Sequence, residues 1–538
     1  MEQTKESSFI KGAAILGIGA LVSKILGAIY RVPYQNITGD EGMYVYQQVY
    51  PLYSVLVILA TAGFPLAISK IISQKLANGD HVGAEQVYRV SSYLLLLTGC
   101  LLFFFLFFGA EFIAAWMGNQ QMLTLPIQSV SFALLLVPVM ASYRGLFQGY
   151  QNMLPSALSQ IIEQTIRVAT ILGLSWYCME AGYGIVYAGA GATFGAFTGA
   201  VCGLLILLYY RRKHRQKWLI TKHLRPVEHT YKLLQQLLLI AFPICLGSLT
   251  IPLYALIDSF SVANLLATRF PMAEVITLKG VYDRGQPLLQ FASFFATALS
   301  LSIVPAIAEA QAKKDTAKQI RLTGLSLRFT FFLGVPASLG LAMIAEPTNV
   351  MLFEDNSGSD ALAILALGTI FLTLSVTIAS ILQGIGRVYL PTLYLAVGIA
   401  IKIMGNLILV PLLDIRGASL ASVLAYFVHA SLSFYALVRF RLIRLHRRIA
   451  LIRKYLLVLG GMVLCVWLVM HLLQLMLSGL VSERLEMTIV AMGSVLAGIV
   501  SYGVLLLRSG LLTREDFQFV PKLEKRLLPI LKRWKILQ

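Results

Sequence analysis

Residues 90–110 read VSSYLLLLTGCLLFFFLFFGA, an uninterrupted run without a single charged side chain. A helix of about 20 apolar residues is long enough to cross the hydrocarbon core of a bilayer. Over all 538 residues, 58% are hydrophobic and 13% are charged, and the mean hydropathy is +0.76. Soluble globular proteins carry about 25% charged residues. The sequence therefore predicts an all-α polytopic membrane protein.

Further apolar runs of similar length lie on both sides of this segment and predict about fourteen transmembrane helices. They cover 9–30, 44–72, 90–110, 123–147, 156–178, 184–210, 236–267, 282–307, 323–345, 360–383, 391–411, 416–438, 455–478 and 486–508. An even number of spans places both termini on one side of the membrane. The loops on that side are rich in Lys and Arg, whereas the opposite loops are short and acidic. Because basic residues are retained on the cytoplasmic side, we expect both termini in the cytoplasm.

The net charge of +19 has a membrane explanation, because its basic residues gather in the predicted cytoplasmic loops and in the tail. We therefore expect these segments to contact anionic lipids, and we expect no nucleic-acid partner. Glycines at four-residue spacing, Gly191, Gly195 and Gly199, are typical of tightly packed membrane helices. The sequence contains no Walker motif, no HExxH and no nucleophile elbow. We expect no enzymatic activity, no metal site and no cofactor, apart from a sodium ion or proton that could couple transport.

Two pairs of segments repeat along the chain. Gln148-Gly149 followed by Leu154-Pro155 matches Gln383-Gly384 followed by Leu390-Pro391, and Pro65 near the end of one span matches Pro305. The partners lie about 235 to 240 residues apart, which predicts an internal duplication. The expected architecture is a six-helix bundle (1–210), a basic linker (211–235), a second six-helix bundle (236–438), two additional helices (439–508) and a basic amphipathic tail (509–538). The two bundles would surround a central cavity, as in many transporters.

Several predicted spans carry a cation in an apolar environment. A charge inside a membrane costs several kcal/mol unless it lines a polar cavity or has a partner. Lys24 and Arg31 are seven residues apart, so both are expected on one face of the first span. Arg328 lies near the end of its span and is expected to reach the headgroups. The predicted cavity cations are Lys24, Arg31, Arg167, Arg284 and Lys402.

Acidic residues in the spans allow two interpretations. Glu163 lies four residues before Arg167 on a polar stripe, Asp283 adjoins Arg284, and Asp258 lies in the seventh span. These carboxylates either form structural ion pairs that fix helix packing, or line the cavity and bind a coupling ion.

The segment Ser23-Lys24-Ile25-Leu26-Gly27-Ala28-Ile29-Tyr30-Arg31, the segment Gly63 to Lys70 and the turn from Gln383 to Pro391 resemble a known family. They are similar to the SpoVB and MurJ-like proteins, in the polysaccharide-transport branch of the multidrug/oligosaccharidyl-lipid/polysaccharide (MOP) exporter superfamily. The likeness extends over essentially the full chain.

This resemblance implies a flippase that moves an undecaprenyl-diphosphate-linked cell-wall precursor, with lipid II as the expected substrate, across the bacterial cytoplasmic membrane. Transport would proceed by alternating access, and cell-wall synthesis enzymes would be possible partners. The family's cavity arginines correspond to Lys24, to Arg31 with a shift of one residue, and to Arg284. An arginine pair expected in the second span is replaced by Leu56-Val57-Ile58-Leu59. Another polyprenyl-linked polysaccharide unit therefore stays open as the substrate.

Two other functions stay open at this point. One is a cation-coupled multidrug exporter with Asp258 or Glu163 as its proton or sodium site; the excess of cations and the two additional spans argue against it. The other is a scaffold that recruits wall-synthesis enzymes through its basic loops.

Overall fold

The computed structural model describes residues 2–214, 229–289, 303–304, 306–443 and 449–512, in which α-helix is the only regular secondary structure. A multi-span chain favours helices because each helix satisfies its backbone hydrogen bonds within its own segment. Among the described residues, ten helical stretches are long and apolar enough to cross a membrane. The protein is therefore an all-α multi-pass membrane protein, as its composition predicts.

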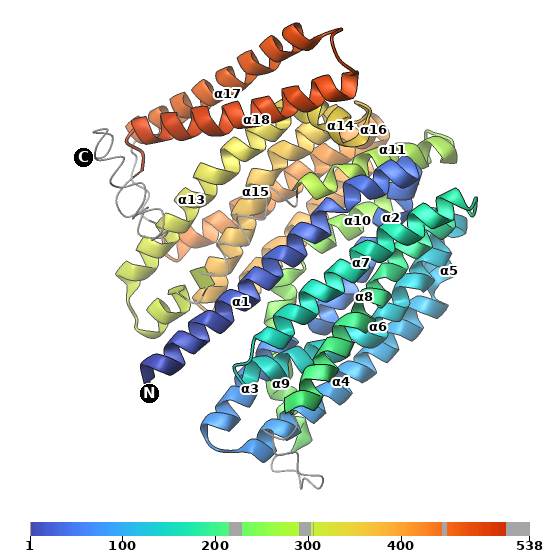
Figure 1. Ribbon diagram of the computed structural model, residues 1–538. Coiled ribbons are helices and arrows are strands. Elements are labelled where there is room, and N and C mark those ends of the chain that lie inside the picture. Colours follow the sequence, from blue (N-terminus) through green and yellow to red (C-terminus); the bar gives the residue numbers. More distant parts are fainter. Residues whose placement is uncertain (1, 215–228, 290–302, 305, 444–448, 513–538) are drawn as a thin grey trace. The chain divides into compact units, whose positions relative to one another are not determined.

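The helices divide between two compact units. Unit 1 comprises Met1–Pro287 with Asn406–Asp414, and unit 2 comprises Leu288–Gly405 with Ile415–Gln538. The helices of unit 1 are α1 (Glu2–Ile29), α2 (Arg31–Thr61), α3 (Phe64–Ala77), α4 (His81–Phe108), α5 (Ala110–Trp116), α6 (Gln120–Gly149), α7 (Leu154–Glu180), α8 (Ile185–His214), α9 (Thr230–Ser248), α10 (Thr250–Leu266) and α11 (Met272–Arg284) (Figure 1). The helices of unit 2 are α13 (Thr316–Met343), α14 (Ala345–Phe353), α15 (Ser359–Gly384), most of α16 (Tyr389–Arg439), α17 (Ile449–Leu477) and α18 (Glu483–Arg508).

The predicted number of fourteen spans stays a prediction. Two of the ten apolar stretches, Ile15–Ala77 and Tyr389–Arg439, each contain two predicted spans, and the predicted span 282–307 lies largely outside the described residues. Most of the basic linker and most of the amphipathic tail also lie outside the described residues, which leave out 215–228 and 513–538.

Two predicted spans, 44–72 and 236–267, are wrong as single helices. The first is divided between α2 and α3 at Gly63, and the second between α9 and α10 at Leu249. A Cβ atom on Gly63 would stand 2.1 Å from the carbonyl oxygen of Ala241 in α9. Only glycine allows the two backbones to approach this closely. Hydropathy alone does not detect such a break, because apolar residues continue on both sides of it.

The structure supports the internal repeat through the shape of its loops. Before α4, Gly79 has φ 72° and the side chain of Asp80 caps the helix by accepting from the amide of residue 83 at 2.7 Å. At positions 235 residues later, Lys314 has φ 54° and the side chain of Asp315 caps α13 by accepting from the amide of residue 318 at 2.9 Å. A left-handed residue followed by an aspartate cap thus recurs at the same spacing.

A second loop recurs with the same spacing. Gln151, after α6, has φ 59°, and Gly386, after α15, has φ 82°. In both loops the next amide closes on the carbonyl five residues earlier, at 2.9 Å from Asn152 to Phe147 and at 2.8 Å from Arg387 to Leu382. This is the Schellman ending of a helix, in which the left-handed position favours glycine. The two loops are therefore equivalent, although only one of them carries the favoured residue.

Replacing Gln151 with glycine is therefore expected to stabilise the protein by about 0.5–1 kcal/mol, because a left-handed glycine is not strained. The matched change, Gly386→Ala, introduces the same strain in the second loop and is expected to lower stability by a similar amount. Thermal unfolding of the purified protein in detergent measures both. Equal midpoints for both variants and the native protein would contradict the expectation.

The glycines of α8 pack as the sequence predicts. A Cβ on Gly195 would lie 2.9 Å from the carbonyl oxygen of Arg167, and one on Gly199 would lie 2.5 Å from that of Glu163. A Cβ on Gly191 would lie 2.9 Å from the Cβ of Leu174. Tight helix packing is thereby confirmed, and it places α8 directly against the charged part of α7.

The additional helices α17 and α18 pack within unit 2. The hydroxyl of Tyr455 donates to the carbonyl of Phe331 at 2.8 Å, and that of Tyr502 donates to the carbonyl of Phe332 at 2.7 Å. Both acceptors lie in α13, one turn before its internal Pro336. Pro336 leaves the carbonyl of Phe332, four residues earlier, without its usual helical donor, and the hydroxyl of Tyr502 supplies one.

Candidate functional site

Glu163 on α7 is held between two arginines. Its two carboxylate oxygens accept from Arg144 of α6 at 2.7 Å and from Arg167 of α7 at 2.8 Å. Arg144 also donates to the hydroxyl of Ser159 at 2.9 Å. The predicted pair of Glu163 and Arg167 thus forms, and the structure adds Arg144, which sequence spacing could not place. One carboxylate balances only one of two cations, so this cluster keeps a net positive charge.

Asp283 on α11 forms an ion pair that the sequence did not identify. Lys279, four residues earlier, places its Nζ 2.5 and 2.6 Å from the two carboxylate oxygens. The side chains are only 1% and 5% exposed. Lys279 was missed because the eighth span was taken to begin at residue 282, whereas α11 begins at Met272. The four-residue spacing to an acid on the same helix was the available signal.

Arg284 ends α11 and is 1% exposed. Its Nη1 lies 3.3 Å from Oδ1 of Asp40 in α2, and the same oxygen accepts from Nε2 of Gln35 at 3.0 Å. The predicted cavity cation therefore has a counter-ion from another helix. Asp40 lies between the predicted spans 9–30 and 44–72, in one of the short acidic loops, and the sequence does not identify it as a partner of Arg284.

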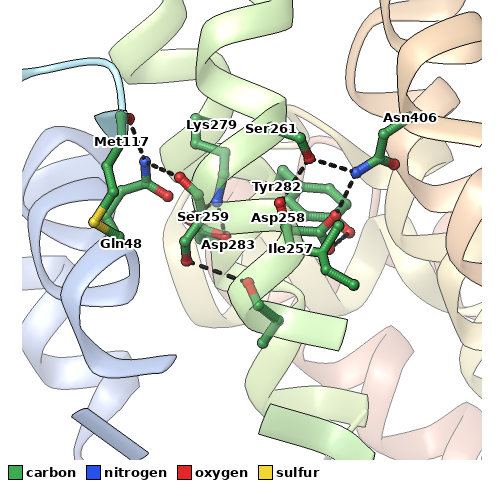
Figure 2. Close-up of polar contacts among 11 residues, drawn as sticks. Gln48, Met117, Ile257, Asp258, Ser259, Ser261, Lys279, Tyr282, Asp283 and Asn406 are labelled. Atoms are coloured by element: carbon green, nitrogen blue, oxygen red, sulfur yellow. Dashed lines mark hydrogen bonds and ion pairs between the residues drawn. The ribbon is translucent and has the colours of Figure 1, made fainter. Parts of the chain in front are cut away.

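Asp258 on α10 is a buried acceptor of hydrogen bonds (Figure 2). The hydroxyl of Tyr282 donates to one carboxylate oxygen at 2.7 Å, and the amide of Asn406 donates to the other at 3.0 Å. Asn406 also donates to the hydroxyl of Ser261 at 2.7 Å. Figure 2 shows the Lys279–Asp283 pair beside these residues. Carboxylates, an ammonium group and neutral donors are thus concentrated around α10 and α11.

Lys24 and Arg31, which the sequence predicts on one helix face, lie on either side of a helix boundary and differ in burial. Helix α1 ends at Ile29, and Arg31 begins α2, so the seven-residue spacing does not run through one continuous helix. Lys24 is exposed on α1, whereas Arg31 is 2% exposed. The guanidinium carbon of Arg31 lies 5.3 Å from the ring centroid of Tyr50. The two cations therefore have different environments.

Lys402 belongs to unit 2 and is fully buried. Its Nζ donates to the carbonyl of Ala418 at 3.0 Å and to the hydroxyl of Ser422 at 2.6 Å. Lys402 follows Arg167 by 235 positions, which is the spacing of the repeated loops. Arg167 and Lys402 therefore hold the same place in the two repeats, where Arg167 donates to a carboxylate and Lys402 donates to neutral oxygens.

Arg328, which was expected to reach the headgroups, donates to the carbonyl of Leu511 at 2.8 Å, beyond the end of α18.

Among the residues that the structure describes, no three His, Cys, Asp or Glu side chains are placed to hold a metal ion. Buried cations and carboxylates such as Arg284 and Asp258 are suited to the recognition of an anionic headgroup or a coupling ion inside the membrane.

Comparisons with known proteins identify membrane proteins as relatives of this chain. The chain is 40% identical over 427 residues to a protein of Bacillus subtilis (strain 168) named "Uncharacterized membrane protein YabM", covering 79% of each chain. It is 30% identical to "Lipid II flippase MurJ" of the same organism, covering 78% of this chain and 80% of the relative. A solved structure named "Lipid II flippase MurJ, inward closed conformation" shares the fold at 14% identity, with a TM-score of 0.63 over 92% of this chain and 99% of that one.

A family model described as "Polysaccharide biosynthesis protein" matches residues 9–311, which is more than half of the chain. The resemblance that the first-span motif carries is thereby confirmed. The chain belongs to the polysaccharide biosynthesis protein family, among the SpoVB and MurJ-like flippases of the MOP superfamily.

Proposed function

We propose that this protein flips an undecaprenyl-diphosphate-linked cell-wall precursor across the bacterial cytoplasmic membrane by alternating access. Lipid II is the substrate that we propose first. The family membership supports a lipid-linked substrate, and a relative of 30% identity is named a lipid II flippase. A diphosphate with a sugar headgroup cannot enter hydrocarbon without compensation of its charge. Cations inside the spans supply that compensation, and the prenyl tail stays in the lipid.

Arg284 is the observation on which the proposal depends. It ends α11 with a side chain that is 1% exposed, and its Nη1 lies 3.3 Å from Oδ1 of Asp40. A phosphate oxygen offers the same kind of acceptor with more negative charge. In the proposed mechanism the diphosphate of the substrate competes with Asp40 for Arg284. The arginine then binds the headgroup during transfer and returns to Asp40 after release.

A coupling ion would have to act on the neighbouring carboxylates. Asp258 accepts from Tyr282 and Asn406, and Asp283 is paired with Lys279. A sodium ion or a proton would have to displace one of these donors. We therefore propose that coupling, whether to an ion gradient or to the membrane potential, acts through Asp258, because the neutral donors Tyr282 and Asn406 are less costly to displace than the ammonium group of Lys279.

Translocation of labelled lipid II in proteoliposomes tests the proposal. The native protein is expected to move lipid II, and Arg284→Gln is expected to move it at least about tenfold more slowly, because a charged hydrogen bond to the headgroup is lost. Arg328→Gln is the matched control, since Arg328 contacts a backbone carbonyl of unit 2, and it should keep the native rate. Native transport by Arg284→Gln would remove Arg284 from the mechanism.

The same liposomes separate the alternative functions. A second labelled polyprenyl-diphosphate lipid, with a saccharide that lacks the peptide, tests for another polysaccharide unit. Transport of that lipid alone would replace lipid II as the substrate and keep the flippase. Export of a cationic dye without movement of either lipid would favour the multidrug exporter instead.

A further inference from the structure

The end of the short helix α5 is held by side-chain amides from two other helices of unit 1. Nδ2 of Asn264 on α10 donates to the carbonyl of Trp116 at 2.7 Å, and Nε2 of Gln48 on α2 donates to that of Met117 at 3.2 Å. Backbone carbonyls at the end of a helix have no partner within it and need donors from elsewhere. We call the side chains of Gln48 and Asn264 the amide latch.

Gln48 joins three elements at one point. It also donates to the carbonyl of Ser259 on α10 at 3.1 Å, so a single buried side chain connects α2, the end of α5 and α10 (Figure 2). Asn264 also donates to the carbonyl of Phe260, one turn earlier on its own helix, at 2.9 Å. Each side-chain amide of the latch thus has acceptors for both of its hydrogens.

Gly118 allows Asn264 to approach the end of α5. Its φ of 95° is a backbone conformation that glycine adopts without strain, and a Cβ there would lie 2.8 Å from Oδ1 of Asn264. Any other residue at this position would be strained and would press on the amide latch. The loop after α5 is therefore shaped to receive a side chain of α10.

The amide latch connects two parts of the chain that alternating access has to separate. Helices α2 and α5 lie in the first half of the internal duplication, and α10 lies in the second half. The loop that contains α5 is one of the short acidic loops predicted on the outer side. An alternating transporter closes one side while the other side is open. An opening between these halves would break the bond from Gln48 to Ser259 and the bond from Asn264 to Trp116.

The closed arrangement also carries a cost. Oε1 of Gln48 is buried and has no donor among the residues that the structure describes. A buried acceptor without a donor is unfavourable, because it has lost its hydrogen bonds to water. Separation of α10 from α2 would let water reach this atom, and the side chain of Asn264 is already exposed. The amide latch is thus a small net interaction that a transport cycle is able to break.

We propose that the amide latch is an outer gate, in which Gln48 and Asn264 hold α10 against α2 and α5 and keep unit 1 closed on its outer side. The gate rests on the alternating access of the proposed function. Neutral amides suit this role, since they hold the closed state without the desolvation cost of a buried charge. The bond of Gln48 contributes more than that of Asn264, because Gln48 is buried whereas water competes for the exposed Asn264.

Labelling of a buried thiol tests the gate without any substrate. Ser259→Cys places a thiol on α10 at a buried position whose backbone carbonyl binds Gln48. A maleimide that cannot cross membranes is added to protoplasts that produce the full-length variant, and labelling of the protein without Ser259→Cys is subtracted to correct for its own cysteines. Adding Gln48→Leu is expected to raise the labelling rate about fivefold, because the closed state loses a hydrogen bond. Adding Asn264→Ala should raise it by a smaller factor.

Two controls separate a gate from general loosening of the protein. Ser175→Cys places a thiol at another buried position of unit 1, on α7, and its labelling should not change when Gln48→Leu is added. Gln319→Leu removes a buried amide from unit 2 and should leave the labelling of Ser259→Cys unchanged. Rates that neither Gln48→Leu nor Asn264→Ala raises, faster labelling at both thiols, or labelling only in permeabilised protoplasts would each overturn the gate.

The same variants distinguish a failure of the gate from a failure of the proposed substrate. Labelling needs no lipid II, so a protein that shows the expected labelling and moves no lipid II keeps the gate and loses the substrate. A protein that moves lipid II while its labelling ignores Gln48→Leu and Asn264→Ala keeps the substrate and loses the gate.

Discussion

Replacing Lys279 with methionine is expected to lower the free energy of unfolding by about 3–5 kcal/mol, the usual cost of removing one partner from a buried ion pair. Lys279 and Asp283 are 1% and 5% exposed, and both carboxylate oxygens face the ammonium group. Methionine keeps the length of the side chain and removes its charge. Asp283 would then remain buried as an anion, or take up a proton at a cost in free energy.

Two further variants show whether charge is the cause. Lys279→Met combined with Asp283→Leu removes both charges and should recover most of the lost stability, since apolar replacements of a buried pair are often tolerated. Lys313→Met disrupts a Lys–Glu pair with the same four-residue spacing at an exposed site, with side chains 68% and 51% exposed, and should leave the unfolding midpoint unchanged. Chemical or thermal unfolding in detergent measures all three. A double variant as unstable as Lys279→Met would show that packing dominates.

Gly280→Ala is expected to destabilise unit 1 by about 1–3 kcal/mol, because the added methyl group has no space. A Cβ at position 280 would stand 2.0 Å from the carbonyl oxygen of Asp40 and 2.7 Å from its carbonyl carbon. These are backbone atoms, so the clash is relieved only if α11 moves away from α2. That movement carries Arg284 at the end of α11 away from its native position, and under the proposed mechanism we therefore expect slower lipid translocation as well.

Gly173→Ala is the matched control for this variant. Gly173 lies inside α7, and a Cβ there would meet no atom within 4 Å. Alanine has the higher helix propensity, so this variant should be as stable as the native protein or more stable by up to about 1 kcal/mol. The two glycine substitutions are thus expected to have opposite signs in one unfolding assay. Equal effects would show that helix propensity, and not close packing, determines the result.

The sequence predicted those features that depend on local composition. Apolar runs identified the helices, and glycines at four-residue spacing identified the close contact of α8 with α7. The counter-ions could not be predicted in the same way. Asp40 reaches Arg284 from a position 244 residues earlier in the chain, and Arg144 reaches Glu163 from another helix. Such pairs depend on tertiary packing, which hydropathy does not encode.

Burial of individual cations was equally hard to derive. Lys24 lies in the first predicted span and Arg31 directly follows it, yet one is exposed and the other is buried, and the end of α1 falls between them. Lys279 was overlooked for a similar reason, since its helix begins before the apolar run does. In both cases an error of a few residues in a helix boundary changed the expected environment of a charge. Boundaries are the least reliable part of a prediction from sequence.

The equal spacing of the repeated loops restricts where this chain can change in length. Residues 80–151 and residues 315–386 contain the same number of positions between equivalent turns, although their side chains have diverged. The thickness of the bilayer limits the length of the helices in both stretches. A helix that gains or loses residues no longer ends at the membrane surface. Fluorescent proteins, epitope tags and cleavage sites inserted by an experimenter therefore belong outside these two stretches.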